Sequence, residues 1–181
     1  MAALDPQCSA DLADFQLIRR RLAATVALLP WLTGLPAAHA APAALGEVVR
    51  WPTVSLLDGR RLSAAALRDV VTVVVFFSTT CTYCGRHNQH VEKLVRASAG
   101  QPLQVIGAAL DRDEALVRDY LRQHAYSFPV TLDHQPLRDA LSARRMIPLT
   151  CVIDRAGQLR EVIPGEMFEA DVLELVRWAR A

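Results

Sequence analysis

One stretch of the sequence decides the fold: Val71-Thr72-Val73-Val74-Val75-Phe76-Phe77-Ser78-Thr79-Thr80-Cys81-Thr82-Tyr83-Cys84. Its first seven residues are all apolar or β-branched, which is typical of a strand buried on both faces of a sheet. Residues 85–96 follow, with apolar side chains at Val91, Leu94 and Val95, and this spacing predicts a helix. Two cysteines, separated by two residues, therefore lie where a buried strand leads into a helix. The unpaired N–H groups and the dipole of a helix start stabilise a thiolate, so the position suits a dithiol that exchanges disulfides.

The first forty residues have the pattern of an export signal. The cluster Arg19-Arg20-Arg21 precedes an apolar stretch over 22–35, and Ala38-His39-Ala40 has the small side chains of a cleavage site. The apolar stretch is shorter than the about 20 residues that a membrane-spanning helix needs. We therefore expect residues 1–40 to be a cleaved signal peptide, either twin-arginine or ordinary, with a retained membrane anchor as the alternative. The protein is then expected to be exported.

The rest of the chain consists of a linker over 41–47 and one domain over 48–181. The formal net charge of the whole chain is +1, a balance that argues against nucleic acid as a partner. After the leader the cysteines are Cys81, Cys84 and Cys151, too few for a multi-bridge scaffold.

Strand and helix patterns alternate along this domain. The order predicts an α/β fold with a central mixed sheet, parallel at its centre and antiparallel at one edge, flanked by helices. Besides the strand 71–77 and the helix 81–98, the predicted elements are a hairpin over 48–57 and 60–62, a short helix capped by Ser63, a strand over 103–110, a helix capped by Asp111 or Asp113, a short segment over 128–132, a helix over 136–143, a strand over 149–153, its hairpin partner over 158–163, and a closing helix over 168–181.

Several motifs together resemble a known family. They are Phe76 to Cys84, Asp58-Gly59, Phe128-Pro129, Leu132-Asp133, and Ile147-Pro148-Leu149-Thr150-Cys151-Val152-Ile153-Asp154 with Gly157. Over about residues 48–180 the chain is similar to the TlpA/ResA-like thioredoxins of bacterial periplasms. This resemblance implies a thioredoxin fold with an N-terminal β-hairpin and an inserted β/α segment.

The resemblance also implies a set of site residues. Pro148 is expected to be a cis-proline that faces the cysteines, with a trans-proline at a strand start as the alternative. Ile147 would then present its backbone to a substrate peptide, and Thr82 and Tyr83 would also contact the substrate.

The two cysteines have distinct expected roles. Cys81 is the attacking thiolate, and its pKa is expected below the usual value of about 8.5. Cys84, one helical turn later, is the more buried resolving thiol. No cofactor is expected beyond the redox-active disulfide Cys81–Cys84, and a purely structural disulfide is the alternative.

The expected function is reduction of specific protein disulfides, as in cytochrome c maturation or copper delivery to oxidases. A membrane thiol electron donor would be a partner, because the periplasm is kept oxidising. The protein is expected to be a monomer. One alternative is an oxidase or isomerase of DsbA-like function. A peroxidase is disfavoured, because Thr79-Thr80-Cys81 lacks the upstream proline pattern of such enzymes.

The chain departs from the family at three positions that tune thiolate stability. Thr80 replaces the usual tryptophan, Tyr83 the usual proline, and His87 a frequent glutamate. The strand 71–77 has no acidic residue to relay a proton. We therefore expect His87 to stabilise a thiolate or relay a proton, with Glu92 as a second candidate for the relay. The alternative for His87 is a surface histidine.

A second class of function uses the same segment. Cys81, Cys84, His87 and His90 are ligand types that bind copper(I) or zinc, so a metal chaperone is an alternative. All four lie within one short segment, whereas a closed tetrahedral site usually takes ligands from two segments, and the main interpretation includes no metal site. Cys151 is expected to be a buried, inert thiol.

Overall fold

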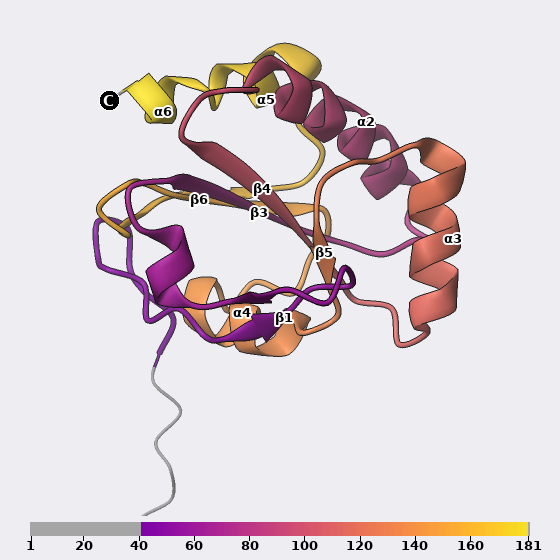
Figure 1. The fold of residues 1–181 in the computed structure, drawn as a ribbon, viewed down its shortest axis with the longest axis horizontal. Coiled ribbons are helices and arrows are strands. Elements are labelled where there is room, and N and C mark those ends of the chain that lie inside the picture. The colour runs from indigo at the N-terminus through magenta and orange to yellow at the C-terminus, as the bar shows by residue number, and fades with distance from the viewer. Residues whose placement is uncertain (1–40, 181) are drawn as a thin grey trace, which may run out of the picture. The chain divides into compact units, whose positions relative to one another are not determined.

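A computed structural model describes residues 41–180, and the predicted signal peptide lies outside these residues. The described part is built on a five-stranded sheet with helices on both faces (Figure 1). The sheet has the strand order β5-β4-β3-β6-β7, and a separate two-stranded sheet pairs β1 with β2. The elements are β1 (Val54–Ser55), β2 (Arg61–Leu62), η2 (Ala64–Leu67), β3 (Val71–Phe77), α2 (Thr82–Ala97), β4 (Leu103–Ala109), α3 (Glu114–His124), β5 (Val130–Thr131), α4 (His134–Leu141), β6 (Leu149–Ile153), β7 (Leu159–Pro164), α5 (Glu169–Glu174) and α6 (Arg177–Arg180).

The strand β3 is the centre of the sheet, and all seven of its residues are buried. It runs parallel to β4, with Val73 opposite Val105, and antiparallel to β6, with Val74 opposite Cys151. The outer strands continue the pattern, because β5 is parallel to β4 and β7 is antiparallel to β6. The predicted mixed sheet is therefore confirmed, and the separate β1–β2 pair is the predicted N-terminal hairpin.

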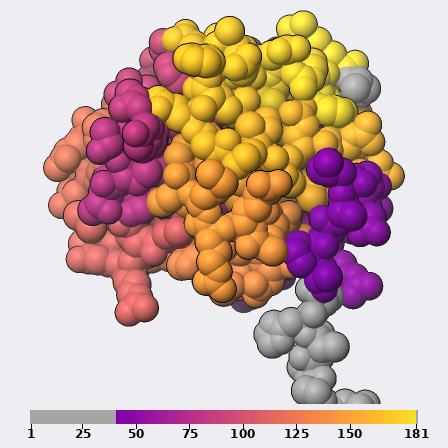
Figure 2. Space-filling model, turned by 180° about the vertical axis from the view of Figure 1, so that it is seen from behind, coloured from indigo at the N-terminus to yellow at the C-terminus, as the bar shows by residue number. Residues whose placement is uncertain are grey.

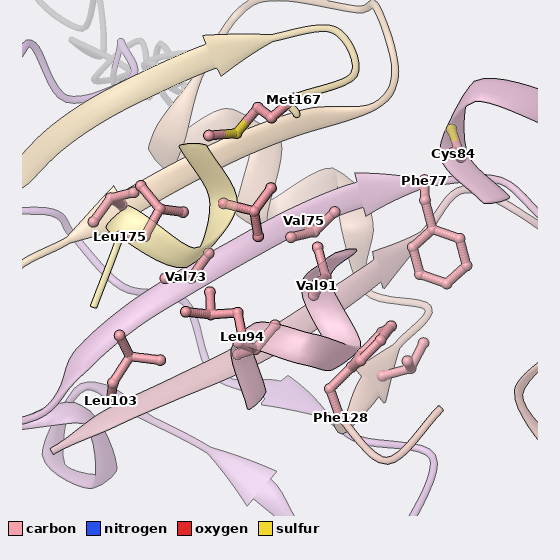
Figure 3. Packing of buried hydrophobic residues seen from close by; sticks show 14 of the residues in the cluster. Val73, Val75, Phe77, Cys84, Val91, Leu94, Leu103, Phe128, Met167 and Leu175 are labelled. Carbon is pink, nitrogen blue, oxygen red and sulfur yellow. The ribbon is translucent and has the colours of Figure 1, made fainter. Parts of the chain in front are cut away.

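Alternate side chains of β3 enter two different cores, as the pleat of a strand requires. Val73, Val75 and Phe77 pack in one cluster with Val91 and Leu94 of α2 (Figure 3). This cluster also holds Cys84, so the second cysteine is part of a packed core. In Figure 1, α2 and α5 lie together on this face of the sheet.

The opposite face of the sheet is covered by α4 and the β1–β2 hairpin (Figure 1). Val74 and Phe76 of β3 pack there with Leu137 and Leu141 of α4. Polar loops follow the carboxyl ends of β3 and β4 at one edge of the sheet, outside the two cores. In an α/β sheet this edge is where binding and catalytic groups collect.

Several predicted boundaries differ in detail from the structure. The predicted closing helix 168–181 forms two short helices, α5 and α6. Ser63 makes no side-chain capping hydrogen bond, and the helix after it is a single 3-10 turn. Of the two candidate caps for α3, Asp113 is the one used, because its carboxylate accepts the N–H groups of Ala115 and Leu116.

The segment 41–47, predicted as a linker, packs along the domain. Ala43 donates its N–H to the carbonyl of Ala140, and Gly46 donates to Leu159. In Figure 2 the indigo N-terminal segment lies directly against the later part of the chain. These hydrogen bonds to α4 and β7 hold the segment against the domain. In residues 41–180, no helix has the length and apolar character needed to cross a membrane.

Candidate active site

The two cysteines form a disulfide at the start of α2. Cys81 is the N-cap of this helix, and its sulfur accepts the backbone N–H of Cys84 at 3.2 Å. The Cα atoms of the pair are 5.2 Å apart. Cys81 is half-buried, whereas Cys84 has no exposed surface and packs near Phe77 (Figure 3). A backbone N–H of the first turn, that of Cys84, thus points at the sulfur that solvent can reach, as expected for an attacking thiolate.

The peptide bond between Ile147 and Pro148 is cis, as the family resemblance implies. Leu149 pairs with Phe76 at the carboxyl end of β3, which brings Pro148 to the same edge of the sheet as the cysteines. The Pro148 carbonyl accepts the N–H of Gly165 at 2.8 Å. Ile147 is half-buried and packs against both cores.

The loop that leads into Cys81 is held by Asp111, a residue whose part in the site the sequence analysis missed. Thr79 donates its hydroxyl to this carboxylate at 2.7 Å and its backbone N–H at 3.0 Å. Ser78 donates its hydroxyl to the same side chain at 3.2 Å. Asp111 follows β4 after one intervening residue, Leu110, so it lies just beyond the carboxyl end of the strand beside β3. That adjacency of two parallel strands was the signal that could have identified it.

Tyr83, between the two cysteines, is 62% exposed. The guanidinium carbon of Arg86 lies 4.9 Å from the centre of its ring. Arg86 in turn donates two hydrogen bonds to the carboxylate of Glu166, at 2.8 and 2.6 Å. This pairing lowers the pKa of Glu166, because the guanidinium stabilises its ionised form. Thr82 is also exposed, so both residues between the cysteines are accessible to a partner.

His87 is fully buried, which contradicts the alternative of a surface histidine. Its Nδ1 accepts the backbone N–H of Met167 at 3.3 Å, so in the neutral ring Nε2 carries the proton and donates to the Thr150 hydroxyl at 3.0 Å. Burial lowers the pKa of His87 to about 4, and the nearby His90 contributes to the same shift. The predicted role as an imidazolium partner of a thiolate or as a relay is not supported, because the ring is neutral near pH 7 and both nitrogens are occupied.

Glu92, the second candidate relay, is also occupied within the protein. Its carboxylate accepts the N–H of Ser127 at 2.7 Å and the Ser127 hydroxyl at 2.9 Å. It also pairs with Arg96 one helical turn later. Glu92 therefore ties α2 to the segment after α3 and does not serve the cysteines.

Cys151 is a buried free thiol on the other face of the sheet, in the core that contains Phe76. Burial raises its pKa to about 12. A thiol that stays protonated and has no access to solvent is inert, as predicted.

The proposed metal ligands do not come together. Among residues 41–180 no group of three or more histidine, cysteine or acidic side chains is placed to hold a metal ion. His87 uses its ring nitrogens for Met167 and Thr150, and His90 lies 3.6 Å from the carboxylate of Glu169. This arrangement gives no support to the metal-chaperone alternative.

Comparison with known proteins agrees with this geometry. Residues 46–162 match the AhpC/TSA family. One curated relative is the "Thiol-disulfide oxidoreductase ResA" of Halalkalibacterium halodurans, 27% identical over 121 residues that make up 66% of this chain and 68% of the relative. The resemblance to the TlpA/ResA-like proteins is thereby confirmed.

Solved structures show the same fold. A putative protein disulfide isomerase from Bacteroides thetaiotaomicron superposes with a TM-score of 0.68 at 19% identity, covering 77% of this chain and 92% of that one. A putative thiol:disulfide interchange protein DsbE from Chlorobium tepidum also gives 0.68, at 17% identity, covering 77% and 99%. The predicted thioredoxin fold is confirmed by these similarities.

Proposed function

Because this chain belongs to the AhpC/TSA family, we propose that it is an exported thiol–disulfide oxidoreductase that reduces specific protein disulfides through Cys81 and Cys84. The observation that carries the proposal is the asymmetry of the pair. Cys81 is half-buried at the start of α2, at the same sheet edge as the cis Ile147–Pro148 bond, and Cys84 is fully buried behind it. One sulfur can meet a substrate while the other is shielded until the first has reacted.

The reaction has two exchanges. The Cys81 thiolate attacks one sulfur of a substrate disulfide, forms a mixed disulfide and releases the other substrate sulfur as a thiolate, which takes a proton from water. Cys84 then gives its proton to water, and its thiolate attacks the Cys81 sulfur and releases the second substrate sulfur as a thiolate, which takes a proton from water in turn. The substrate gains two electrons, and the protein ends with the disulfide that the structure contains.

Substrate recognition combines backbone and side-chain contacts. In this proposal the backbone of Ile147, held before the cis-proline, receives the substrate peptide. Tyr83 and Thr82 contact the residues around the substrate disulfide. The exposure of both side chains and the fixed position of the Tyr83 ring under Arg86 support this assignment.

The reducing direction implies a second partner. After each cycle the disulfide Cys81–Cys84 must be returned to the dithiol, and an oxidising compartment supplies no soluble reductant for this. We assign that step to a membrane thiol donor. The substrates are those of cytochrome c maturation or copper-site assembly, the protein is periplasmic, and it acts as a monomer.

A trapping experiment tests this proposal. In the Cys84→Ser variant the resolving thiol is absent, so the mixed disulfide between Cys81 and a protein disulfide substrate such as insulin accumulates. The Cys81→Ser variant is the matched control and forms no mixed disulfide at this site. If Cys84→Ser and Cys81→Ser trap substrate equally poorly, the assignment of Cys81 as the attacking thiol is wrong.

A further inference from the structure

One buried polar atom near the cysteines has no partner within the described residues 41–180. Asn88 has no exposed surface, and its Nδ2 donates to the Tyr120 hydroxyl at 3.3 Å. Its Oδ1 is buried and accepts no hydrogen bond there. Leaving such an acceptor unsatisfied is costly, because the buried oxygen loses the hydrogen bonds that it makes to water in the unfolded chain, so its retention needs a reason.

The position of Asn88 on the helix gives that reason. It lies four residues after Cys84 in α2, and residues spaced this way are neighbours on one helix face. Helical side chains lean toward the helix N-terminus, so the amide of Asn88 lies over the turn that contains Cys84 and Gly85.

The Tyr120 hydroxyl indicates on which side of this turn the amide nitrogen lies. It receives the Asn88 Nδ2 hydrogen bond, and it is also the atom, at 3.9 Å, that a Cβ atom on Gly85 would meet. The amide nitrogen therefore lies on the Tyr120 side of the turn. The remaining neighbour in the preceding turn is Cys84, which is also fully buried and belongs to the same core as Tyr120.

The redox state decides whether Cys84 can use this acceptor. In the disulfide form the Cys84 sulfur carries no hydrogen and donates nothing. Reduction adds two electrons and two protons to the pair, and one proton makes the Cys84 thiol, which is a hydrogen-bond donor. The donor thus exists only in the reduced protein.

We propose that Asn88 is the hydrogen-bond partner of the reduced resolving thiol, with Oδ1 accepting the S–H of Cys84. This role rests on the proposed dithiol function and assigns a further residue to it. The bond stabilises the dithiol, and the orphaned oxygen destabilises the disulfide, so both effects favour the reduced state. Of the other polar side chains buried on α2, His87 and Glu92 are already bound to Thr150, Met167 and Ser127. The half-buried His90 has an Nδ1 without a hydrogen-bond partner among residues 41–180, but this atom faces Glu169 at 3.6 Å.

The test is the dithiol–disulfide equilibrium of the full-length protein in glutathione buffers. Free thiols are trapped by alkylation, and mass spectrometry of the peptide that carries Cys81 and Cys84 gives the reduced fraction. Asn88→Leu keeps the shape of the side chain and removes its polar atoms. We expect the equilibrium constant to shift about tenfold toward the disulfide, which is about 30 mV lower in midpoint potential for this two-electron couple.

Tyr126→Phe is the matched control. It removes the hydrogen bond from the Tyr126 hydroxyl to the Gly85 carbonyl, in the same turn of α2, and leaves Asn88 and its Tyr120 partner unchanged. The equilibrium constant should then stay at the wild-type value even if stability falls. An unchanged constant in Asn88→Leu, or an equal shift in Tyr126→Phe, overturns the proposal. If wild type itself shows no reversible couple, the failure belongs to the proposed function.

A second measurement does not depend on how the redox pair responds. In a Cys81→Ser background the thiol of Cys84 is permanent, and a bonded S–H has a lower infrared stretching frequency than a free one. The infrared difference spectrum compares the Cys81→Ser protein with the Cys81→Ser, Asn88→Leu protein. The protein that retains Asn88 should contribute the S–H band of a hydrogen-bonded Cys84, and the leucine variant the band of a free Cys84. The S–H bands of Cys8 and Cys151 are common to both proteins and cancel. A free Cys84 band in the protein that retains Asn88 contradicts the proposal, whether or not the leucine variant folds.

Discussion

His87 and Thr150 are joined by a buried hydrogen bond of 3.0 Å. It ties the helix that carries both cysteines to the strand that follows the cis-proline. The backbone N–H of Met167 binds the other ring nitrogen, so a third segment is fixed by the same side chain. A histidine held in this way positions the site as a neutral group, because a protonated Nδ1 cannot accept the Met167 N–H.

The first prediction concerns acid stability. The pKa of His87 in the folded protein is about 4, below its ordinary value of 6.5. As the pH falls, His87 is therefore protonated in the unfolded chain before it is protonated in the folded protein. The free energy of unfolding should be at its full value above about pH 6.5 and should fall by on the order of 3 kcal/mol as the pH drops toward about 4. Urea unfolding at a series of pH values measures this slope of the free energy of unfolding against pH.

The variants for that measurement are His87→Leu and His134→Gln. His87→Leu should flatten the slope between about pH 6.5 and 4, although it also lowers stability at neutral pH by leaving Thr150 and Met167 without partners. His134→Gln changes a histidine on α4, on the other face of the sheet, and should keep the slope. A slope that persists in His87→Leu would assign the acid sensitivity to another group.

The second prediction concerns the loop before Cys81. Asp111→Ala removes the acceptor for three hydrogen bonds from Ser78 and Thr79, so the free energy of unfolding should fall by about 1–3 kcal/mol. The reduction of a protein disulfide should slow, because Cys81 is no longer held in one position. Asp119→Ala, on the exposed face of α3, is the control and should change neither quantity. Equal rates in all three proteins would show that the loop needs no such support.

The sequence was enough to predict the mixed sheet, its two cores and the position of the cysteine pair. The run Val71–Phe77 is apolar or β-branched at every position, and the apolar side chains that follow it recur with the period of a helix. The partners of His87 were not predictable. Spacing placed His87 one turn after Cys84, but Thr150 and Met167 are 63 and 80 residues away, and a single sequence contains no signal for such long-range contacts. The packing of residues 41–47 was missed for the same reason.

The third prediction concerns substrate binding. Tyr83→Ala removes the exposed ring beside the disulfide, so KM for a protein disulfide should rise several-fold while the rate with a small disulfide such as oxidised glutathione stays near wild type. Leu45→Ala is the control, because Leu45 is 65% exposed and lies outside the site. A loss of activity that is equal for the protein and the small disulfide would mean that Tyr83 tunes the cysteines and does not bind substrate.

The fourth prediction uses two glycines with opposite surroundings. A Cβ on Gly107 would lie 2.9 Å from Val130 and 3.0 Å from both Phe128 and Phe77, so Gly107→Ala should destabilise the fold by about 1–3 kcal/mol through overpacking. Gly85→Ala has only the Tyr120 hydroxyl at 3.9 Å and should stabilise α2 by about 0.5–1 kcal/mol. Denaturant titration of both variants checks the signs, and a stable Gly107→Ala variant would contradict the observed packing of β4 against β5.

The most direct measurement of the central claim is the midpoint potential of the Cys81–Cys84 couple in the full-length protein, obtained by equilibration with thiol buffers and trapping of free thiols. The account predicts a reversible two-electron couple near that of thioredoxin, about −270 mV, as a dedicated reductant requires. A reversible couple near that of DsbA, about −120 mV, would make the protein an oxidant and contradict the proposed direction of electron flow.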